Sequence, residues 1–293
     1  MGATLASLLA WAGLSACAAS SPDAPAPLLG EQRQQTIVYR EGDGYTLRLH
    51  VFLPPDYAAT QSRAAAVFFF GGGWKSGQPS QFFMHCEHLA ARGMVAMSAE
   101  YRVETRNGTS PAECVEDGQA AVRWVREHSS ALGIDPDRIA AGGGSAGGQV
   151  AAAAATTVAF DRSRGDSTTS CVPDALILFN AVIDNGPDGY GYDRVGDYWE
   201  AFSPLHNLRA TTPPTVMFLG TKDRLIPVAT AEAYCQRMES LGARCELYLY
   251  EGKGHGFFNK SASPESYVDT VAKMDAFLES LGFLDPAPEG IQP

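Results

Sequence analysis

From residue 142 to residue 148 the chain reads Gly142-Gly143-Gly144-Ser145-Ala146-Gly147-Gly148. This run follows an apolar segment typical of a strand and precedes a helical pattern over residues 146–159. It contains the pattern G-x-S-x-G, in which a serine occupies a sharp turn between a strand and a helix. Such a turn strains the serine backbone, and glycines on both sides let the strand and the helix approach closely. The run therefore predicts a nucleophilic serine at position 145.

Two other kinds of glycine-rich loop have similar patterns. A phosphate-binding loop of the form G-x-x-x-x-G-K-[ST] needs a lysine that this run lacks. A dinucleotide-binding G-x-G-x-x-G pattern matches residues 142–147 formally, but that pattern normally lies at the first strand–helix turn of its fold. Here it lies in the middle of the chain, so the nucleophilic turn is the favoured interpretation.

Apolar segments with strand character alternate with helical patterns on both sides of this turn. Residues 46–53 alternate between apolar and polar, as in a half-exposed edge strand, whereas residues 65–70 are continuously apolar, as in a strand buried on both faces. The expected strands cover residues 46–53, 65–70, 94–99, 139–141, 175–179, 215–219 and 245–250, and the expected helices cover residues 80–92, 112–130, 146–159, 229–241 and 264–281. This alternation predicts an α/β fold with a mainly parallel central sheet and helices on both faces.

We expect a single domain over residues 36–284, because no internal repeat or second alternating pattern is present. Residues 182–212 form an irregular segment rich in Gly, Asp, Tyr and Pro. A structureless connection of this length is uncommon unless it serves a site. The segment is therefore predicted to cover the functional site.

A nucleophilic serine needs a general base, and the chain offers six histidines. Four of them fall on expected helices or on the first strand, namely His50, His85, His88 and His128. His206 lies in the irregular segment, where a substrate contact is possible but a base would be unusual. His255 lies in a glycine-rich loop directly after the last strand, and glycines let that loop reach back across the sheet edge. We therefore expect His255 to be the base.

The base in turn needs a carboxylate that orients it. Asp223 follows the strand at 215–219 and precedes His255 by one helix, which gives the chain order serine, acid, histidine. Asp184, which follows the preceding strand, is the alternative acid. Asp223 is the favoured one.

Negative charge that develops on a substrate carbonyl needs hydrogen-bond donors. The strand at 65–70 opens into Phe70-Gly71-Gly72-Gly73-Trp74, where backbone without side chains can approach an oxygen closely. Two N–H groups of this loop, together with that of Ala146, are expected to form an oxyanion hole. The alternative is that these glycines serve only close packing.

Together these motifs resemble those of the α/β-hydrolase esterases, and more narrowly the bacterial acetylxylan and feruloyl esterase-like branch related to the hormone-sensitive-lipase group. The resemblance covers nearly all of residues 36–282. The motifs that carry it are Phe70-Gly71-Gly72-Gly73-Trp74, Glu100-Tyr101-Arg102, Gly143-Gly144-Ser145-Ala146-Gly147, Gly220-Thr221-Lys222-Asp223 and Gly254-His255-Gly256.

The resemblance implies an α/β-hydrolase fold and a catalytic triad of Ser145, Asp223 and His255. It also implies oxyanion donors at Gly72, Gly73 and Ala146, a preference for esters over amides, and acylated plant or algal polysaccharides as substrates. The chemistry requires no metal or organic cofactor. One position departs from the family: Phe70 stands where the loop normally has a histidine. In the family that histidine supports the loop and does not donate to the oxyanion, so activity is expected to survive the change.

Several aromatic side chains near the expected site could stack against a sugar ring or an aromatic acyl group. The candidates for substrate binding are Trp74, Tyr190, Tyr192 and Trp199, with Tyr198 beside them. Equally, these rings could be ordinary anchors of the covering segment. That segment also carries Asp184, Asp188, Asp193 and Asp197, which favours neutral hydroxylated substrates over anionic ones.

The chain has 22 Lys and Arg against 33 Asp and Glu in 293 residues, a formal charge of −11. An acidic chain without a basic block is a poor binder of nucleic acid, so a nucleic-acid partner is excluded. Residues 1–17 have an apolar run ending in Leu14-Ser15-Ala16-Cys17, which resembles the lipobox of bacterial lipoproteins although no basic residue precedes it.

That resemblance implies an exported protein of the cell envelope, attached to a membrane through a lipidated Cys17. A secreted protein with an ordinary signal cut near Ala18-Ala19 is the alternative. Residues 18–35, rich in Pro and Ala, are expected to be a tether, and residues 285–293 a C-terminal tail.

Cysteine usage fits an oxidising compartment. Without Cys17, five cysteines remain, which allows two disulfides and one free thiol. The first expected pair is Cys235 with Cys245, at a helix end and the start of a strand, and the second is Cys86 with Cys114.

Three function classes follow. The favoured class is a serine esterase that hydrolyses small acyl esters, of the acetyl or feruloyl type, on small-molecule or polysaccharide substrates. A serine peptidase of the prolyl-oligopeptidase type shares this catalytic domain but usually carries a further large domain. A non-catalytic binding lipoprotein on a hydrolase scaffold is the third class. The sequence does not fix the oligomeric state.

Overall fold

A computed structural model describes residues 1, 28–30, 32–157, 159–162 and 167–286. All of the predicted signal peptide after residue 1, including Cys17, lies outside these residues, as do most of the tether and most of the C-terminal tail. Among the described helices, none has both the length and the hydrophobicity needed to cross a membrane.

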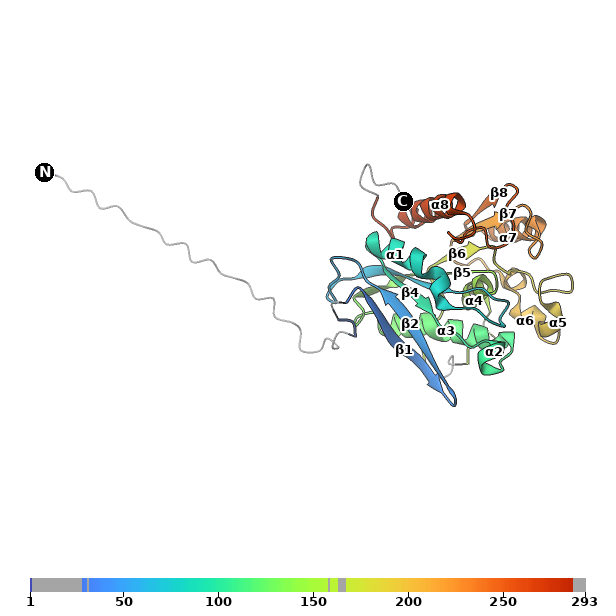
Figure 1. The fold of residues 1–293 in the computed structure, drawn as a ribbon, viewed down its shortest axis with the longest axis horizontal. Coiled ribbons are helices and arrows are strands. Elements are labelled where there is room, and N and C mark those ends of the chain that lie inside the picture. The colour runs from blue at the N-terminus through green and yellow to red at the C-terminus, as the bar shows by residue number, and fades with distance from the viewer. Residues whose placement is uncertain (2–27, 31, 158, 163–166, 287–293) are drawn as a thin grey trace.

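An eight-stranded sheet runs through the molecule in the order β1-β2-β4-β3-β5-β6-β7-β8 (Figure 1). Its first two pairings, β1 with β2 and β2 with β4, are antiparallel, and all the others are parallel. The strands are β1 (Gln34–Gly42), β2 (Tyr45–Phe52), β3 (Arg63–Phe69), β4 (Val95–Ala99), β5 (Ile134–Gly144), β6 (Ala175–Phe179), β7 (Thr215–Gly220) and β8 (Cys245–Tyr250). The predicted mainly parallel sheet is confirmed, and the arrangement is the α/β-hydrolase fold.

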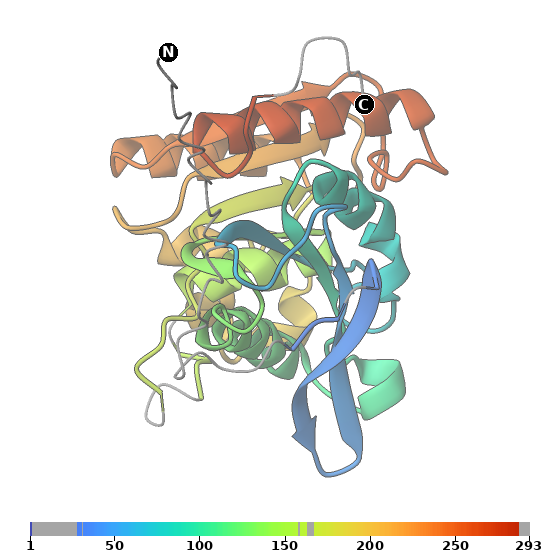
Figure 2. The same ribbon diagram turned by 90° about the vertical axis from the view of Figure 1, so that its left-hand side faces the viewer.

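Helices cover both faces of this sheet, as predicted (Figures 1 and 2). Side chains of α3, α4 and α7 share one buried cluster with Val67 and Phe69, whereas side chains of α1 and α8 share the opposite cluster with Ala66 and Phe68. This division follows from the two-residue period of a strand. The long helices are α1 (Phe83–Ala91), α3 (Pro111–Glu127), α4 (Ala146–Thr156), α7 (Val228–Ser240) and α8 (Pro264–Ser280). The short ones are η1 (Pro79–Phe82), α2 (Glu104–Asn107), α5 (Tyr192–Val195), α6 (Trp199–Phe202) and η2 (Pro204–Asn207).

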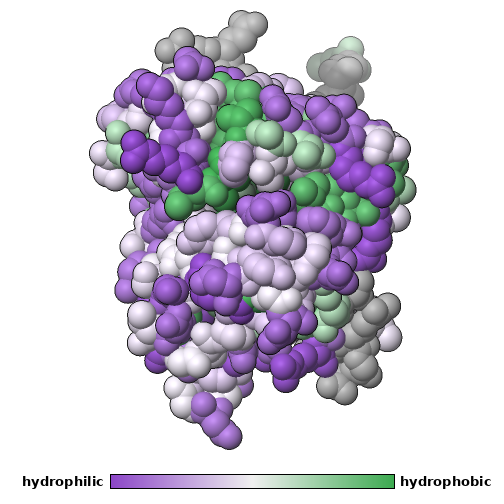
Figure 3. Space-filling view, turned by 90° about the vertical axis from the view of Figure 1, so that its right-hand side faces the viewer, coloured by the Kyte–Doolittle hydropathy of each residue, from purple (hydrophilic) through white to green (hydrophobic). Residues whose placement is uncertain are grey.

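The edges of the sheet differ from the sequence-based expectation at one side. β2 was expected at the edge, but β1 pairs with it through the tight Gly42–Tyr45 turn and takes the edge position. β1 was missed because its side chains are mostly polar and exposed. β8 forms the other edge, where Leu249 is exposed. Figure 3, which faces the side of α5, α6 and β8, shows its apolar surface mainly in the upper half and polar surface below.

The disulfide between Cys235 of α7 and Cys245 of β8 is present, which confirms the first expected pair. The second expected pair is wrong, because Cys86 and Cys114 are both free and buried. Cys86 of α1 and Cys114 of α3 belong to core clusters on opposite faces of the sheet, so the sheet separates them.

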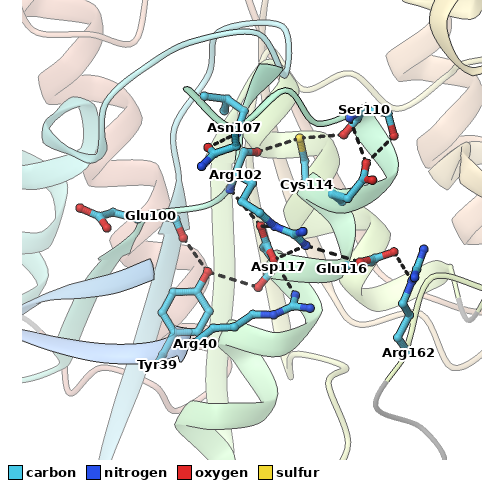
Figure 4. A network of polar contacts seen from close by, with 12 residues as sticks. Tyr39, Arg40, Glu100, Arg102, Asn107, Ser110, Cys114, Glu116, Asp117 and Arg162 are labelled. Atoms are coloured by element: carbon cyan, nitrogen blue, oxygen red, sulfur yellow. Dashed lines mark hydrogen bonds and ion pairs between the residues drawn. The ribbon is translucent and has the colours of Figure 1, made fainter. Parts of the chain in front are cut away.

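A buried carboxylate connects the β1–β2 hairpin to the main body (Figure 4). Asp117 of α3 is fully buried, and its oxygens accept hydrogen bonds from Arg40 of β1 at 2.5 Å and from Arg102 at 2.8 and 2.9 Å. The backbone N–H of Arg102 also donates to Asp117, at 2.9 Å. Beside this group the Tyr39 hydroxyl donates to the carbonyl of Glu100 at 2.6 Å. One side chain thus joins β1, the segment after β4 and α3.

We predict that Asp117→Ala lowers the free energy of unfolding by about 3 kcal/mol, because it leaves the Arg40 guanidinium without an anion and leaves Arg102 with only the Glu116 carboxylate, at 3.5 Å. Urea denaturation measures the change. Asp269→Ala, which removes an exposed ion pair with Lys273 and a hydrogen bond from the Tyr250 hydroxyl, is the matched control and should cost less than about 1 kcal/mol. Equal effects of the two substitutions would contradict the role assigned to Asp117.

Candidate active site

Ser145 occupies the turn between β5 and α4 with φ of 54° and ψ of −121°, in the strained region predicted from the glycine cluster. Close packing explains the glycines on both sides. A Cβ on Gly147 would lie 2.1 Å from the carbonyl oxygen of Phe69, and a Cβ on Gly143 would lie 2.5 Å from the same oxygen. The Ser145 N–H donates to the carbonyl of Phe179 on the neighbouring strand at 3.0 Å. The backbone of the turn is therefore fixed from several directions.

The structure brings His255 and Asp223 to this serine. His255 Nε2 lies 2.9 Å from Ser145 Oγ, and His255 Nδ1 lies 2.7 Å from Asp223 Oδ2. Asp184, the alternative acid, lies elsewhere: its Oδ1 accepts the N–H of Gly186 and is 3.8 Å from His206. The three side chains expected to act together are thus within hydrogen-bond distance of one another.

The Asp223 carboxylate is almost fully buried, with its side chain 1% exposed. Burial raises its pKa, but hydrogen bonds from His255 and from the N–H groups of Leu225 and Ile226 outweigh burial, so the pKa is lowered overall. An ionised carboxylate only accepts hydrogen bonds, so His255 Nδ1 must carry the proton that faces it. Nε2 is then free to accept the proton of Ser145.

Asn180 is a third polar neighbour of His255, and it was not predicted. It directly follows β6, is buried, and has φ of 35°. Its Nδ2 lies 3.3 Å from His255 Nε2, and its Oδ1 accepts the N–H of Gly256 at 3.3 Å. Its place at the carboxyl end of a parallel strand is the sequence signal that could have indicated it.

The glycine loop after β3 lies beside Ser145. The N–H of Gly71 donates to Gln81 Oε1 at 2.7 Å. No acceptor for the N–H groups of Gly72 and Gly73 occurs within the described residues, and Ala146, as the first residue of α4, has no acceptor inside its helix. Gly72 and Gly73 have φ of 134° and 64°, values that favour glycine. The expected oxyanion donors are therefore free to bind an oxygen.

Phe70, which replaces the family's histidine, faces the protein interior. Its ring stacks on Tyr101 at 4.2 Å between centroids, and the Tyr101 hydroxyl donates to its carbonyl at 2.6 Å. Gln81 supports the loop from the other side, and its Nε2 donates to Asn259 Oδ1 at 3.2 Å. Asn259 Nδ2 in turn donates to the carbonyl of Gly256, next to His255, at 2.8 Å. Two amide side chains thus link the glycine loop to the histidine loop, and sequence analysis missed both.

A cleft of about 750 Å³, the active-site cleft, opens over Ser145 and His255. Besides Ser145 and His255, the polar side chains Lys75, Gln78, Ser80, Gln81, Asn180 and Asn259 line it. Tyr190, Leu225 and Phe258 supply the larger apolar surfaces. A second hollow of about 640 Å³, the side hollow, adjoins His255 and is lined by Lys222, Asp223, Arg224, Gly252, Gly254 and His255.

Of the aromatic residues expected to bind substrate, only Tyr190 lines the active-site cleft. The prediction is wrong for Trp74, which is 1% exposed, donates from Nε1 to Gln149 at 3.1 Å and packs under the guanidinium of Arg194. Tyr192 and Trp199 line neither the cleft nor the side hollow, and their rings contact each other. The covering segment nevertheless reaches the site, because Arg194 donates to the carbonyl of Gly73.

A second serine, histidine and aspartate lie close together in that segment. His206 Nδ1 is 2.9 Å from Ser203 Oγ and 3.8 Å from Asp184 Oδ1. Both partners approach the same ring nitrogen, so the ring cannot pass a proton between them, and Ser203 is fully buried. This group therefore lacks the geometry of a nucleophilic site. No three His, Cys, Asp or Glu side chains of the described chain form a metal-binding group.

Two family models match the chain. The model described as BD-FAE matches residues 49–188, and that of the dienelactone hydrolase family matches residues 190–287. Among curated proteins, the chain is 26% identical to a probable isoprenylcysteine alpha-carbonyl methylesterase of Arabidopsis thaliana over 76% of this chain and 50% of that protein. It is 26% identical to the esterase LipC of Mycobacterium tuberculosis, over 81% of this chain and 64% of that one.

Solved structures give a fuller match. A thermophilic esterase of the planctomycete Thermogutta terrifontis, with butyrate bound, is 40% identical and has a TM-score of 0.83, covering 87% of this chain and 97% of that one. The same esterase phosphorylated by paraoxon is 41% identical, with a TM-score of 0.83 and coverage of 88% and 98%. The chain therefore belongs to the α/β-hydrolase esterases.

Behind the cleft lies a buried histidine with aromatic neighbours. His85 of α1 is 1% exposed, and its ring contacts those of Phe82, Phe179 and Phe258, the last of which lines the cleft. Neither ring nitrogen has a hydrogen-bond partner within the described residues. Burial, with a smaller effect from His88, lowers the pKa of His85 to about 3.

Protonation of His85 should therefore oppose folding. The pKa of His85 is lower in the folded than in the unfolded state. The stability that depends on neutral His85 is therefore fully present above pH ~6.5 and is lost as the pH falls toward 3. Between pH 7 and pH 5 the loss from this group is about 2 kcal/mol. We predict that between pH 7 and pH 5 the free energy of unfolding of His85→Phe falls by about 2 kcal/mol less than that of the wild type. Urea denaturation at the two pH values measures the difference. An unchanged pH dependence in the variant would contradict the assignment.

Proposed function

We propose that the protein is a serine carboxylesterase that uses Ser145, His255 and Asp223. The observation that carries the proposal is the pair of hydrogen-bond distances, 2.9 and 2.7 Å, that joins the three side chains at a strained turn. His255 takes the proton of Ser145 as Oγ attacks the ester carbonyl, and Asp223 stabilises the imidazolium that forms. His255 and Asp223 thus suffice to activate the Ser145 hydroxyl as a nucleophile.

The tetrahedral intermediate places negative charge on the former carbonyl oxygen. The N–H groups of Gly72, Gly73 and Ala146 are the donors proposed to stabilise it, and loss of one such donor typically costs about 10²–10³-fold in rate. His255 then donates its proton to the leaving alcohol oxygen, and the acyl group stays on Ser145. Water, deprotonated by His255, attacks the acyl-enzyme and releases the acid.

We propose short acyl groups, of the acetyl type, as the acyl part of the substrate. Support comes from the Thermogutta terrifontis esterase, whose structures contain butyrate and propionate. A feruloyl-type acyl group is the second candidate, and it rests on the resemblance to feruloyl esterases.

For the alcohol part we propose a carbohydrate. The active-site cleft supports this choice because the amides of Gln78, Gln81, Asn180 and Asn259 line it, and amides can both donate to and accept from hydroxyl groups. Aromatic stacking contributes less than the sequence suggested, since only Tyr190 is in position.

We also propose that the protein is exported to the cell envelope and attached to a membrane through Cys17. The Cys235–Cys245 disulfide supports an oxidising compartment.

We predict that Ser145→Ala lowers kcat/KM for p-nitrophenyl acetate by about four to six orders of magnitude while the fold is retained, because the nucleophile is lost. Ser203→Ala is the matched control, since Ser203 also contacts a histidine but is buried away from the cleft, and it should keep wild-type activity. A peptide p-nitroanilide assayed in parallel tests the peptidase alternative. Preference for the anilide would favour a peptidase, and an inactive wild type would favour a binding protein.

We predict a second, smaller effect for Gln81→Leu, which removes the acceptor of the Gly71 N–H and the link to Asn259. Misplacement of the oxyanion donors should lower kcat by about 10–100-fold with KM changed by less than about threefold. Gln81→Glu, which restores an acceptor for Gly71, should recover part of the loss.

Gln78→Leu is the comparison variant, because Gln78 lines the same cleft but its side chain makes no hydrogen bond within the described residues. It should alter KM rather than kcat. If Gln81→Leu lowered the melting temperature but left kcat unchanged, Gln81 would be only a structural residue.

A further inference from the structure

Most cations of this acidic protein are already engaged in ion pairs, hydrogen bonds or contacts with aromatic rings. A few are not: within the described residues, the lysine and arginine side chains without such a contact are Arg33, Lys75, Lys222, Arg224 and Arg237. Lys75 lines the active-site cleft, and Lys222 and Arg224 line the side hollow. The unengaged cations are thus concentrated on both sides of His255, although the chain as a whole has a formal charge of −11.

No available carboxylate opposes these cations in the two spaces. Among the residues that the structure describes, the only acidic one that lines either space is Asp223, whose side chain is 1% exposed and hydrogen-bonded to His255. The aspartates of the covering segment, which had suggested neutral substrates, line neither space. That sequence-based expectation therefore does not describe the surroundings of the triad.

The proposed mechanism determines which half of the substrate meets Lys222 and Arg224. Because His255 Nε2 must donate a proton to the leaving oxygen, the alcohol half has to lie against His255. His255 lines both the cleft and the side hollow, and Lys222 and Arg224 flank Asp223 in the chain. Leu225, the next residue, lines the cleft itself. An alcohol that extends beyond His255 therefore reaches the two cations.

We infer that the alcohol half of the substrate carries a carboxylate, as in an O-acylated hydroxy acid or sugar acid, and that Lys222 and Arg224 bind it. The inference rests on the proposed esterase function. Exposed cations interact with a nearby anion only modestly and are screened by salt, so the expected preference for a carboxylate is about tenfold in kcat/KM at low ionic strength. Guanidinium and ammonium groups together also suit carboxylate recognition.

Two aryl acetates of similar size test this inference. The alcohol half of 4-acetoxybenzoate carries a carboxylate, and that of 4-acetoxybenzamide carries an uncharged amide in its place. The readout is the ratio of their kcat/KM values, divided by the ratio of their rates of hydrolysis by hydroxide. We expect a corrected ratio of about ten for the wild type at low salt, falling toward one in 1 M NaCl. We expect a ratio near one for the Lys222→Gln, Arg224→Gln double variant.

Arg237→Gln is the matched control, because Arg237 is also unengaged but lines neither space, and it should keep the wild-type ratio. A wild-type ratio near one, or a high ratio that persists in the double variant, would overturn the inference. So would loss of the preference in Lys75→Gln alone, which would place the anion on the other side of His255. If the wild type hydrolysed neither ester, the esterase proposal itself would fail, so the two failures are distinguishable.

Discussion

The backbone strain at Ser145 is the constraint on which the rest of the site depends. A non-glycine residue with φ of 54° is unfavourable by itself, and it persists here because the surrounding backbone leaves no alternative. Gly143 and Gly147 pack against the carbonyl of Phe69, and the N–H of Ser145 is bound by Phe179. These contacts place the hydroxyl at the carboxyl edge of the sheet, where His255 can reach it.

The sheet supplies the remaining groups from neighbouring strands. In the order β3, β5, β6, β7 and β8, each carboxyl end delivers one part: the glycine loop, Ser145, Asn180, Asp223 and the His255 loop. Gln81 and Asn259 then connect the first of these loops to the last. Rigid strands thus determine the positions, and the amide contacts determine the orientations of the loops that carry the donors and the base.

The sequence alone predicted the features that depend on local backbone conformation and on the hydrophobic period. Parallel strands, the glycine turn and the loops after them follow from hydrophobic period and glycine placement, which is why Ser145, Asp223 and His255 could be selected. Contacts across the sheet could not be predicted: nothing in the sequence shows that Cys86 and Cys114 lie on opposite faces, or that Trp74 turns inward. Gln81 and Asn259 were missed for the same reason, because they meet only after both loops have folded.

The central claim is that Ser145 forms a covalent acyl intermediate. Intact-protein and peptide mass spectrometry of a rapidly quenched reaction with p-nitrophenyl acetate tests it most directly. The account predicts one acetyl group per protein molecule, located on the peptide that contains Ser145. Turnover without an acylated protein would contradict it. So would an acetyl group that is carried by another residue and is hydrolysed during turnover.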